Sequence, residues 1–208
     1  MFGRLRATMQ RWFTPLANLL IRRGVSPDAV TIAGTVIVTV LALTLLPTGH
    51  LTLGALLIGL FVLTDSLDGV MARASGRSGP WGAFLDSTLD RVSDGAVFAG
   101  ITLWFALHPQ EPWAGAGTVA ALACLVLGSV VPYARARAES VGATAAVGIA
   151  ERSDRLVVAL VPTAFVQVGL PVAVLVVVLG LLALASLVTV AQRVLTVRSQ
   201  LLHTTEGA

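Results

Sequence analysis

The sequence predicts an all-α integral membrane protein with six transmembrane helices and, before them, an amphipathic helix at the membrane interface. Of its 208 residues, 56% are hydrophobic and only 12% are charged, whereas soluble domains carry roughly 25% charged residues. The apolar residues form six segments, and each approaches the roughly 20 residues that a helix needs to cross the hydrocarbon core. These segments are residues 29–47, 52–74, 82–107, 113–137, 155–170 and 172–196.

Residues 1–24 come before the first span and have an amphipathic pattern. Apolar residues recur there at helical spacing, and arginines take many of the other positions. This pattern is typical of a helix that lies in the membrane interface; a helix packed on a partner protein is the alternative. Residues 25–198 are then expected to form one six-helix domain, and residues 199–208 a polar C-terminal tail.

The positive charges predict the orientation of the spans. The chain has no lysine, and its arginines lie beside alternate ends of the spans, while the loops "PTGH", "HPQEP" and "GLP" hold none. By the positive-inside rule, both termini are cytoplasmic in a multi-pass protein of the cell membrane. Trp104 and Trp113 are expected to anchor the opposite interface. Because the arginines cluster at span ends rather than on one basic face, we expect no nucleic-acid binding.

Four aspartates stand in or next to apolar segments. Asp65 and Asp68 are three residues apart, and Asp86 and Asp90 are four apart, so each pair shares one helix face. An ionised aspartate near the bilayer centre costs about 2.5–3.5 kcal/mol, and mutual repulsion adds to that cost. A divalent cation would offset both. Carboxylate oxygens without nearby His or Cys favour Mg²⁺ or Mn²⁺ over zinc.

The four carboxylates could hold two metal ions about 3.5–4 Å apart, which suits phosphoryl transfer. The alternative is a set of buried ion pairs with Arg73 and Arg91, although two bases do not balance four acids. Asp94 lies one turn beyond Asp90. We expect it to bond to a neighbouring helix rather than to support the metal ligands. A cation transporter is a further alternative, but no internal repeat is visible in the chain.

With its spacing, the stretch is Asp65-x2-Asp68-Gly69-x2-Ala72-Arg73-x8-Gly82-x3-Asp86-x3-Asp90. It resembles the signature of the CDP-alcohol phosphotransferases, with every specified position filled. The resemblance implies a six-helix membrane enzyme, usually a homodimer, in which two metal ions bind a CDP-linked lipid. The acceptor alcohol attacks the β-phosphorus, and CMP leaves. It also implies that Asp65, Asp68 and Asp86 are metal ligands. Asp90 would be both a ligand and the general base.

Other positions of the resemblance concern the CDP group. Gly69 and Arg73 would contact it. The turn "SPDAVT" resembles the nucleotide-contacting turn of the family, which implies contacts from Asp28, Ala29, Val30 and Thr31. Alternatively, Asp28 is only the N-cap of the first span. Ser78 and Gly79 occupy the loop position at which relatives touch CDP; because Gly79 has no hydroxyl, its contact would come from the backbone.

Three arginines at predicted cytoplasmic helix ends, Arg135, Arg155 and Arg193, could converge on a phosphate, since guanidinium groups suit phosphate monoesters. The alternative is that they only orient the spans. Arg137 and Arg152 are second choices.

The stretches "AVTIAGT", "DRVSDGAVF", "RARAE" and "ERSDR" resemble the bacterial phosphatidylinositol phosphate synthases within the family. That resemblance implies CDP-diacylglycerol as the donor and 1D-myo-inositol 3-phosphate as the acceptor. Arg135 stands where those relatives carry lysine, which keeps the charge and changes the hydrogen-bond geometry. Glycerol 3-phosphate, the acceptor of phosphatidylglycerophosphate synthases, is the alternative acceptor.

Overall fold

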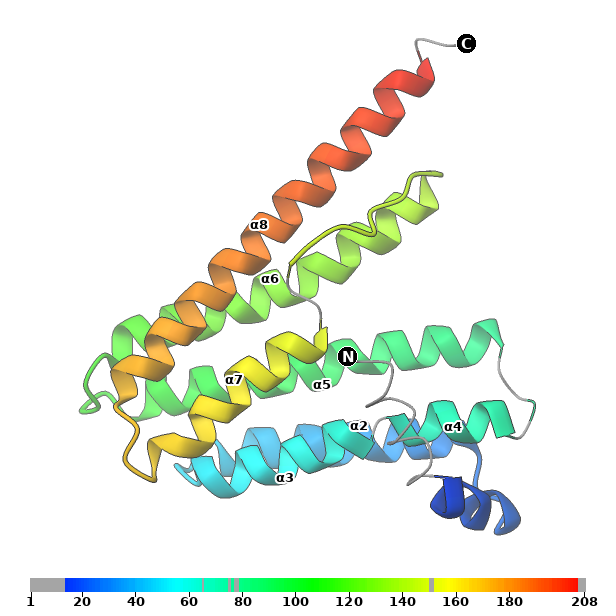
Figure 1. Ribbon diagram of the computed structural model, residues 1–208. Helices are drawn as coiled ribbons and strands as arrows, with labels where there is room; N and C mark the ends of the chain where they lie inside the picture. The colour runs from blue at the N-terminus through cyan, green and yellow to red at the C-terminus, as the bar shows by residue number, and fades with distance from the viewer. Residues whose placement is uncertain (1–13, 65, 75, 77–78, 150–151, 206–208) are drawn as a thin grey trace.

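The computed structural model describes residues 14–64, 66–74, 76, 79–149 and 152–205. Within these ranges the regular structure is helical, with no strand, which confirms the all-α prediction. Residues 14–22 form a helix, and seven labelled helices follow (Figure 1). They are α2 (Pro27–Leu45), α3 (Leu51–Thr64), α4 (Ser66–Ala74), α5 (Pro80–Leu107), α6 (Ala114–Ser140), α7 (Arg152–Val166) and α8 (Val172–Thr205).

The first predicted span begins with a local cap. The Ser26 hydroxyl accepts a hydrogen bond from the Ala29 N–H at 3.2 Å, which satisfies one of the N–H groups that a helix start leaves without an intrahelical partner. Pro27 suits the first helical position because it has no N–H to lose there. Asp28 lies inside the first turn. The alternative that Asp28 is the N-cap is therefore wrong, because Ser26 takes that place.

Within the part of the chain that the structure describes, three helices meet both the length and the composition expected of a membrane span: Pro27–Leu45, Ala114–Ser140 and Val172–Leu202. Leu51–Val62 is apolar but shorter. The second predicted span corresponds to α3 and α4, with residue 65 between them outside the described residues. α7 has only 15 residues, and the first half of α5 carries several charged side chains. The protein is therefore a helical membrane protein that combines helices long enough to cross a membrane with shorter apolar helices.

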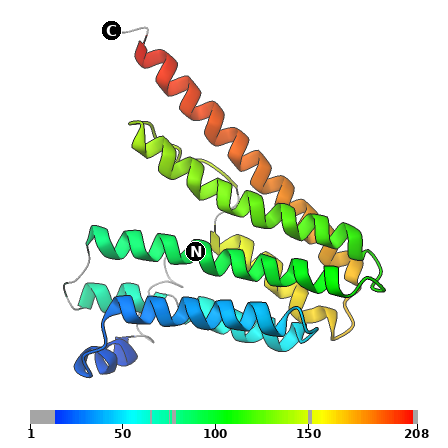
Figure 2. The same cartoon turned by 180° about the vertical axis from the view of Figure 1, so that it is seen from behind.

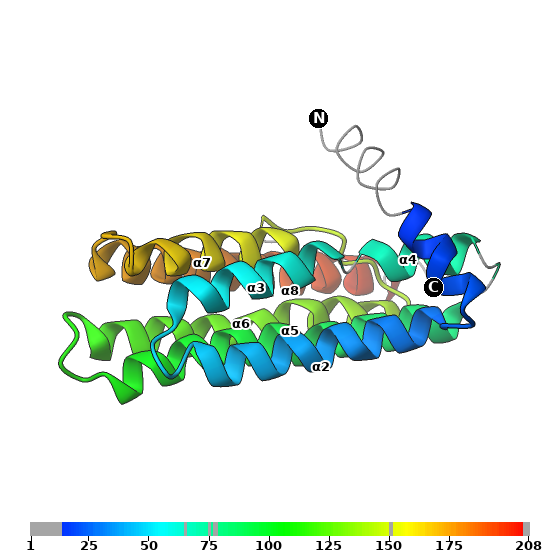
Figure 3. The same cartoon turned by 90° about the horizontal axis from the view of Figure 1, so that it is seen from below.

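The helices run back and forth along one long axis (Figure 3). α5 packs between α2 and α6, α8 packs on α6 and α7, and α3 packs on α2 and α7. Toward their C-terminal ends, α6 and α8 lean away from the other helices, as both Figure 1 and the reverse view in Figure 2 show. At Gly100, α2 comes close to α5, because a Cβ there would lie 2.3 Å from the Ala42 carbonyl oxygen. A larger residue would force these helices apart.

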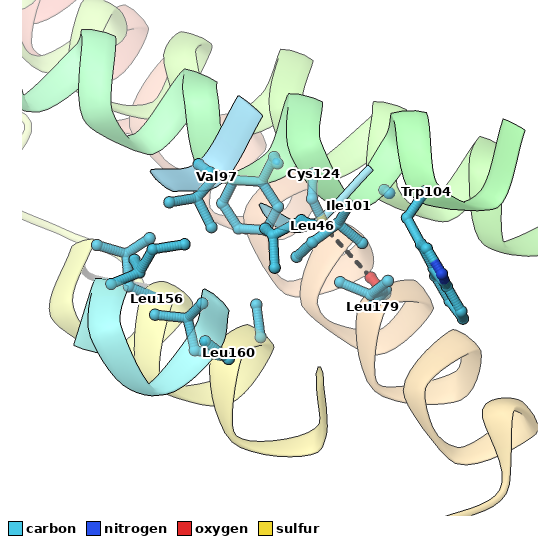
Figure 4. Packing of buried hydrophobic residues seen from close by; sticks show 14 of the residues in the cluster. Leu46, Val97, Ile101, Trp104, Cys124, Leu156, Leu160 and Leu179 are labelled. Carbon is cyan, nitrogen blue, oxygen red and sulfur yellow. Dashed lines mark hydrogen bonds between the residues drawn. The ribbon is translucent and has the colours of Figure 1, made fainter. Parts of the chain in front are cut away.

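A continuous apolar core joins α2, α3, α5, α6, α7 and α8 (Figure 4). Cys124 of α6 lies within it, and its thiol donates to the Leu179 carbonyl of α8 at 3.2 Å. Trp104 is only 4% exposed and packs beside Phe105 in the same core. The expectation that Trp104 anchors an interface is wrong, because neighbouring helices cover its ring. Trp113, at 63% exposure, remains accessible as expected of an anchor.

The helix of residues 14–22 docks onto the bundle. Ala17 is buried against Val70 and Met71 of α4, while Leu16 and Leu19 stay exposed. This helix thus packs on its own chain and still presents apolar side chains outward, as an interfacial helix does.

Candidate functional site

The start of α2 and the start of α5 are joined at one end of the bundle. The Trp81 indole Nε1 donates to the Asp28 carboxylate at 3.0 Å. α4 also packs against α2, and its Val70 and Met71 meet the helix of residues 14–22. The α2 and α4 residues expected to contact CDP therefore lie at the same end as the first turns of α5 (Figure 1).

The four residues expected beside cytidine differ in accessibility. Asp28 is partly buried, and Ala29 is exposed. Val30 packs partly against the apolar cluster beneath α4. Thr31 is buried, and its hydroxyl donates to the Pro27 carbonyl at 3.2 Å. Asp28 and Ala29 are thus the members of this group that a nucleotide can reach most readily.

The structure describes two of the four expected metal ligands in full. Asp86 and Asp90 lie one turn apart on α5, with Asp86 exposed and Asp90 partly buried. Asp68 belongs to α4, but its side chain and all of Asp65 fall outside the described residues. Arg91 Nη2 lies 3.6 Å from the Asp90 carboxylate. Asp90 therefore forms one of the ion pairs that the alternative interpretation of these aspartates predicts.

The chemistry of the described donors fits a hard divalent cation. Among the side chains that the structure describes, no group of three His, Cys, Asp or Glu residues is arranged to hold a metal. The Asp86 and Asp90 carboxylates supply oxygen donors from one helix face, and such donors suit Mg²⁺ or Mn²⁺. A complete site of the expected kind would need Asp65 and Asp68 as well.

The remaining residues expected at the CDP group border the α4–α5 connection. Arg73 is exposed in the last turn of α4. Gly79 precedes α5 in an extended backbone conformation and is exposed. Gly69 lies in α4 without a described environment, and Ser78 is outside the described residues. Arg73 and Gly79 are therefore exposed on either side of this connection.

Asp94 and Arg155 form a buried ion pair that joins α5 to α7. Arg155 Nη2 lies 3.3 Å from Asp94 Oδ2, and the two residues are 1% and 5% exposed. The expectation that Asp94 bonds to a neighbouring helix is confirmed. The sequence did not identify Arg155 as its partner, because the two residues are 61 positions apart.

A proline in α6 explains a second contact of Arg155. Pro132 lies inside α6, and because proline has no N–H, the carbonyl of Gly128 lacks its usual partner four residues ahead. Arg155 Nη2 donates to that carbonyl at 3.4 Å. Three residues further on, the Val131 carbonyl accepts a hydrogen bond from Arg193 of α8. Arg155 and Arg193 thus converge on one turn of α6 from two different helices.

Arg135 takes a different direction from the other two expected phosphate ligands. It lies one turn beyond Val131 and is exposed, and its Nε contacts the Glu139 carboxylate at 3.0 Å. This is an exposed i, i+4 pair, and pairs of that kind contribute little to stability. Arg137, a second choice, bonds to Ser140 at 3.1 Å; the side chain of Arg152 lies outside the described residues.

The connection between α6 and α7 is attached along one face of α8. Thr144 exchanges two hydrogen bonds with the Gln200 amide, at 2.9 and 2.8 Å. Arg193 Nε donates to the Val147 carbonyl at 2.9 Å, and the Ile149 N–H donates to the Thr189 hydroxyl at 3.2 Å. We call residues 143–149 the α8 strap. Arg193 of α8 therefore contacts both the strap and α6.

An open pocket of about 520 Å³ lies between this strap and α8, lined by Ala146, Val147, Gly148, Ile149, Gln192, Leu195 and Thr196.

The sequence analysis did not identify Gln200 as a partner of the strap, because it assigned residues 199–208 to a polar tail, whereas α8 continues through residues 199–205. The signal available in advance was the Gln amide itself, which can donate to and accept from one extended backbone segment.

Comparison with known proteins identifies relatives along almost the whole chain. The phosphatidylinositol phosphate synthase of Streptomyces avermitilis is 46% identical over 211 residues, covering 94% of this chain and 81% of the relative. That of Mycobacteroides abscessus is 46% identical over 200 residues, covering 93% of this chain and 87% of the relative.

Solved structures agree with these relatives. The crystal structure of Mycobacterium tuberculosis phosphatidylinositol phosphate synthase with CDP-DAG bound matches with a TM-score of 0.84 at 43% identity, covering 90% of this chain and 94% of that one. The same enzyme in complex with manganese and citrate gives a TM-score of 0.83 at 43% identity, covering 89% of this chain and 88% of that one.

The profile of the CDP-alcohol phosphatidyltransferase family matches residues 24–152. This range contains the complete aspartate signature, both ends of the α4–α5 connection and the α6 turn on which the arginines converge. The signature and the relatives agree on an enzyme rather than a cation transporter. The chain therefore belongs to the CDP-alcohol phosphatidyltransferase family.

Proposed function

We propose that the chain is a phosphatidylinositol phosphate synthase of phospholipid biosynthesis. It would transfer the phosphatidyl group of CDP-diacylglycerol to 1D-myo-inositol 3-phosphate and release CMP. The observation that carries this proposal is the match to synthases of that name at 46% identity over more than nine-tenths of the chain. Arg155 and Arg193, which meet at one turn of α6, support a phosphorylated acceptor.

We assign the donor site to the end of the bundle where α2, α4 and α5 meet. Asp65, Asp68, Asp86 and Asp90 would hold two divalent metal ions, Mg²⁺ or Mn²⁺. When bound, such ions neutralise charge on a pyrophosphate. The contacts to CDP-diacylglycerol come from Gly69, Arg73, Ser78, Gly79 and the start of α2 at residues 28–31.

Asp90 is the proposed general base. The acceptor hydroxyl gives its proton to the Asp90 carboxylate while its oxygen bonds to the β-phosphorus of the donor. The bond between that phosphorus and the oxygen of CMP breaks, and CMP leaves with the electron pair. Asp90 is partly buried beside Arg91, about three turns into α5, in the half of α5 that leads to the proposed donor site.

We assign the acceptor phosphate to Arg135, Arg155 and Arg193. Guanidinium groups bind phosphate oxygens through paired N–H donors. Arg155 and Arg193 already share one turn of α6. Arg135 forms an exposed ion pair with Glu139, and a phosphate can displace an exposed partner of this kind at small cost. A phosphorylated acceptor suits three guanidinium groups better than an unphosphorylated alcohol does.

We propose the cell membrane as the location, with residues 25–198 as a six-pass catalytic domain in a homodimer. The arginine-bearing helix ends would face the cytoplasm. In this orientation the acyl chains of the donor stay in the bilayer, while the soluble acceptor arrives from water at the side of the aspartates. α3 and α4 run in the same direction and together make one pass, while the other helices alternate in direction (Figure 3), which supports an even number of passes.

An acceptor assay tests the proposed function. Purified protein in detergent with CDP-diacylglycerol and Mg²⁺ or Mn²⁺ receives either inositol 3-phosphate or glycerol 3-phosphate, and CMP release is followed. We expect CMP release with inositol 3-phosphate and none when a chelator removes the metal. Activity with glycerol 3-phosphate alone would reject the acceptor assignment in favour of a phosphatidylglycerophosphate synthase, and metal-independent activity would reject the metal assignment.

A further inference from the structure

We propose that Asp94 is a positioning residue for the acceptor phosphate. It would hold the guanidinium of Arg155 where α5, α6 and α7 meet, and so set the distance between the phosphate and the reacting hydroxyl. This inference rests on the proposed function, since it assumes that Arg155 binds a phosphorylated acceptor. It adds a residue outside the aspartate signature and gives that residue a role in acceptor selection.

The first support is the position of Asp94 on α5. Asp86, Asp90 and Asp94 follow one another at intervals of four residues, so they share one helix face. One such interval spans about 6 Å along a helix axis. Asp94 therefore places its partner guanidinium about one turn deeper in the bundle than the proposed general base, Asp90.

The second support is the way in which Arg155 is held. Its Nη2 contacts Asp94 Oδ2 of α5 at 3.3 Å and the Gly128 carbonyl of α6 at 3.4 Å. The Gly128 carbonyl is available because Pro132 has no N–H. A guanidinium is planar and rigid. Two fixed contacts at Nη2, from two helices, therefore also determine the directions of the other N–H bonds of Arg155.

The third support is charge. Arg155 and Asp94 are 1% and 5% exposed, and a charge buried to this extent needs a counter-charge. A buried ion pair often adds little stability compared with apolar residues of the same size. Arg193, from α8, reaches the same turn of α6 as Arg155, which places a second cation beside the pair.

Four variants of the full-length protein test the proposal. Asp94→Asn keeps the shape and removes the charge, whereas Asp94→Glu keeps the charge on a longer side chain. A charge swap, Asp94→Arg with Arg155→Asp, keeps an ion pair but moves the guanidinium from α7 to α5. The control is Thr163→Val on α7, which removes a buried hydroxyl that donates to Ala159 within the same helix.

For each variant, kcat and KM are measured for both substrates by CMP release, and thermal stability is measured with and without CDP-diacylglycerol. We expect Asp94→Asn to raise the KM for inositol 3-phosphate by about ten-fold or more, with the KM for CDP-diacylglycerol changed less than about two-fold. Asp94→Glu should recover part of that loss. Thr163→Val should leave both KM values unchanged.

A purely structural role gives a different result. Asp94→Asn would then lower thermal stability and leave the acceptor KM of the folded protein at the wild-type value, which overturns the proposal. If Asp94→Asn does not fold, the charge swap decides. Restored stability with a raised acceptor KM supports the proposal, and restored stability with the wild-type KM overturns it.

The wild-type protein separates this inference from the proposed function. If it uses glycerol 3-phosphate instead of inositol 3-phosphate, the proposed function fails. The positioning role is then measured with glycerol 3-phosphate and stands if Asp94→Asn raises that KM. If the wild-type protein releases CMP with neither phosphate, both proposals are overturned.

Discussion

Gly148 holds the α8 strap in a backbone conformation that other residues rarely adopt, so Gly148→Ala should be strongly destabilising. Its φ is +140°, and an added Cβ would lie 2.3 Å from Cγ2 of Thr189, well inside the roughly 3.5–4 Å contact distance of carbon atoms. The backbone strain is worth about 1–3 kcal/mol, and the overpacking about 1–3 kcal/mol. We therefore expect a loss of about 2–6 kcal/mol.

A second variant separates the two contributions. Thr189→Ser removes Cγ2 and keeps the hydroxyl that accepts from Ile149. With Cγ2 gone, the nearest Thr189 atom to the added Cβ is the hydroxyl oxygen, at 3.3 Å. The double variant should recover about 1–3 kcal/mol relative to the sum of the single changes. Gly142→Ala is the matched control in the same connection, because its φ is +78° and an added Cβ would meet no atom of the described residues within 4 Å.

Thermal unfolding in detergent, followed by tryptophan fluorescence, measures these changes. Gly142→Ala should lose only the backbone contribution of about 1–2 kcal/mol. Because Val147 of the strap contacts Arg193, Gly148→Ala should also raise the KM for the acceptor phosphate. Equal losses of stability in Gly148→Ala and Gly142→Ala, or no recovery from Thr189→Ser in the double variant, would refute a clash between the added Cβ and Thr189.

Two further predictions concern the donor end. Asp90→Asn should lower kcat by about 10²-fold or more, while CDP-diacylglycerol still stabilises the variant against heat; normal turnover would remove Asp90 as the base. Trp81→Phe deletes the indole N–H that holds Asp28 at 3.0 Å and should raise the KM for CDP-diacylglycerol by roughly two- to ten-fold. An unchanged donor KM, or an equal rise for the acceptor, would show that this contact does not organise the nucleotide site.

Local signals in the sequence located the helices well. The first predicted span, 29–47, corresponds to Pro27–Leu45, and the fourth, 113–137, to Ala114–Ser140. These agreements arise because a helix depends on hydropathy and on residues near its own ends, such as Ser26 and Pro27. α7 begins at Arg152, three residues before the predicted span at 155, because charged residues in its first turn hide its start from a hydropathy criterion.

Side-chain environments were predicted less well. Trp104 is buried rather than interfacial, because helix packing, and not the residue type, decides which face of α5 meets lipid. The guanidinium group of Arg155 is of the type that binds phosphate at a protein surface, yet it lies in a buried ion pair with Asp94. Pro132 gave a partial signal, since a proline within an apolar span leaves a carbonyl available. The sequence did not show that Arg155 is the side chain that donates a hydrogen bond to that carbonyl.

The sequence by itself determined the helical membrane class, the aspartate signature and the family, because hydropathy and residue spacing are properties of neighbouring positions. Only the tertiary structure decided that Asp94 pairs with Arg155 across 61 residues and that Gln200 binds the strap across 56. Such pairs depend on how whole helices pack against one another. Packing is set by the combined fit of many side chains, and no local pattern in the chain records it.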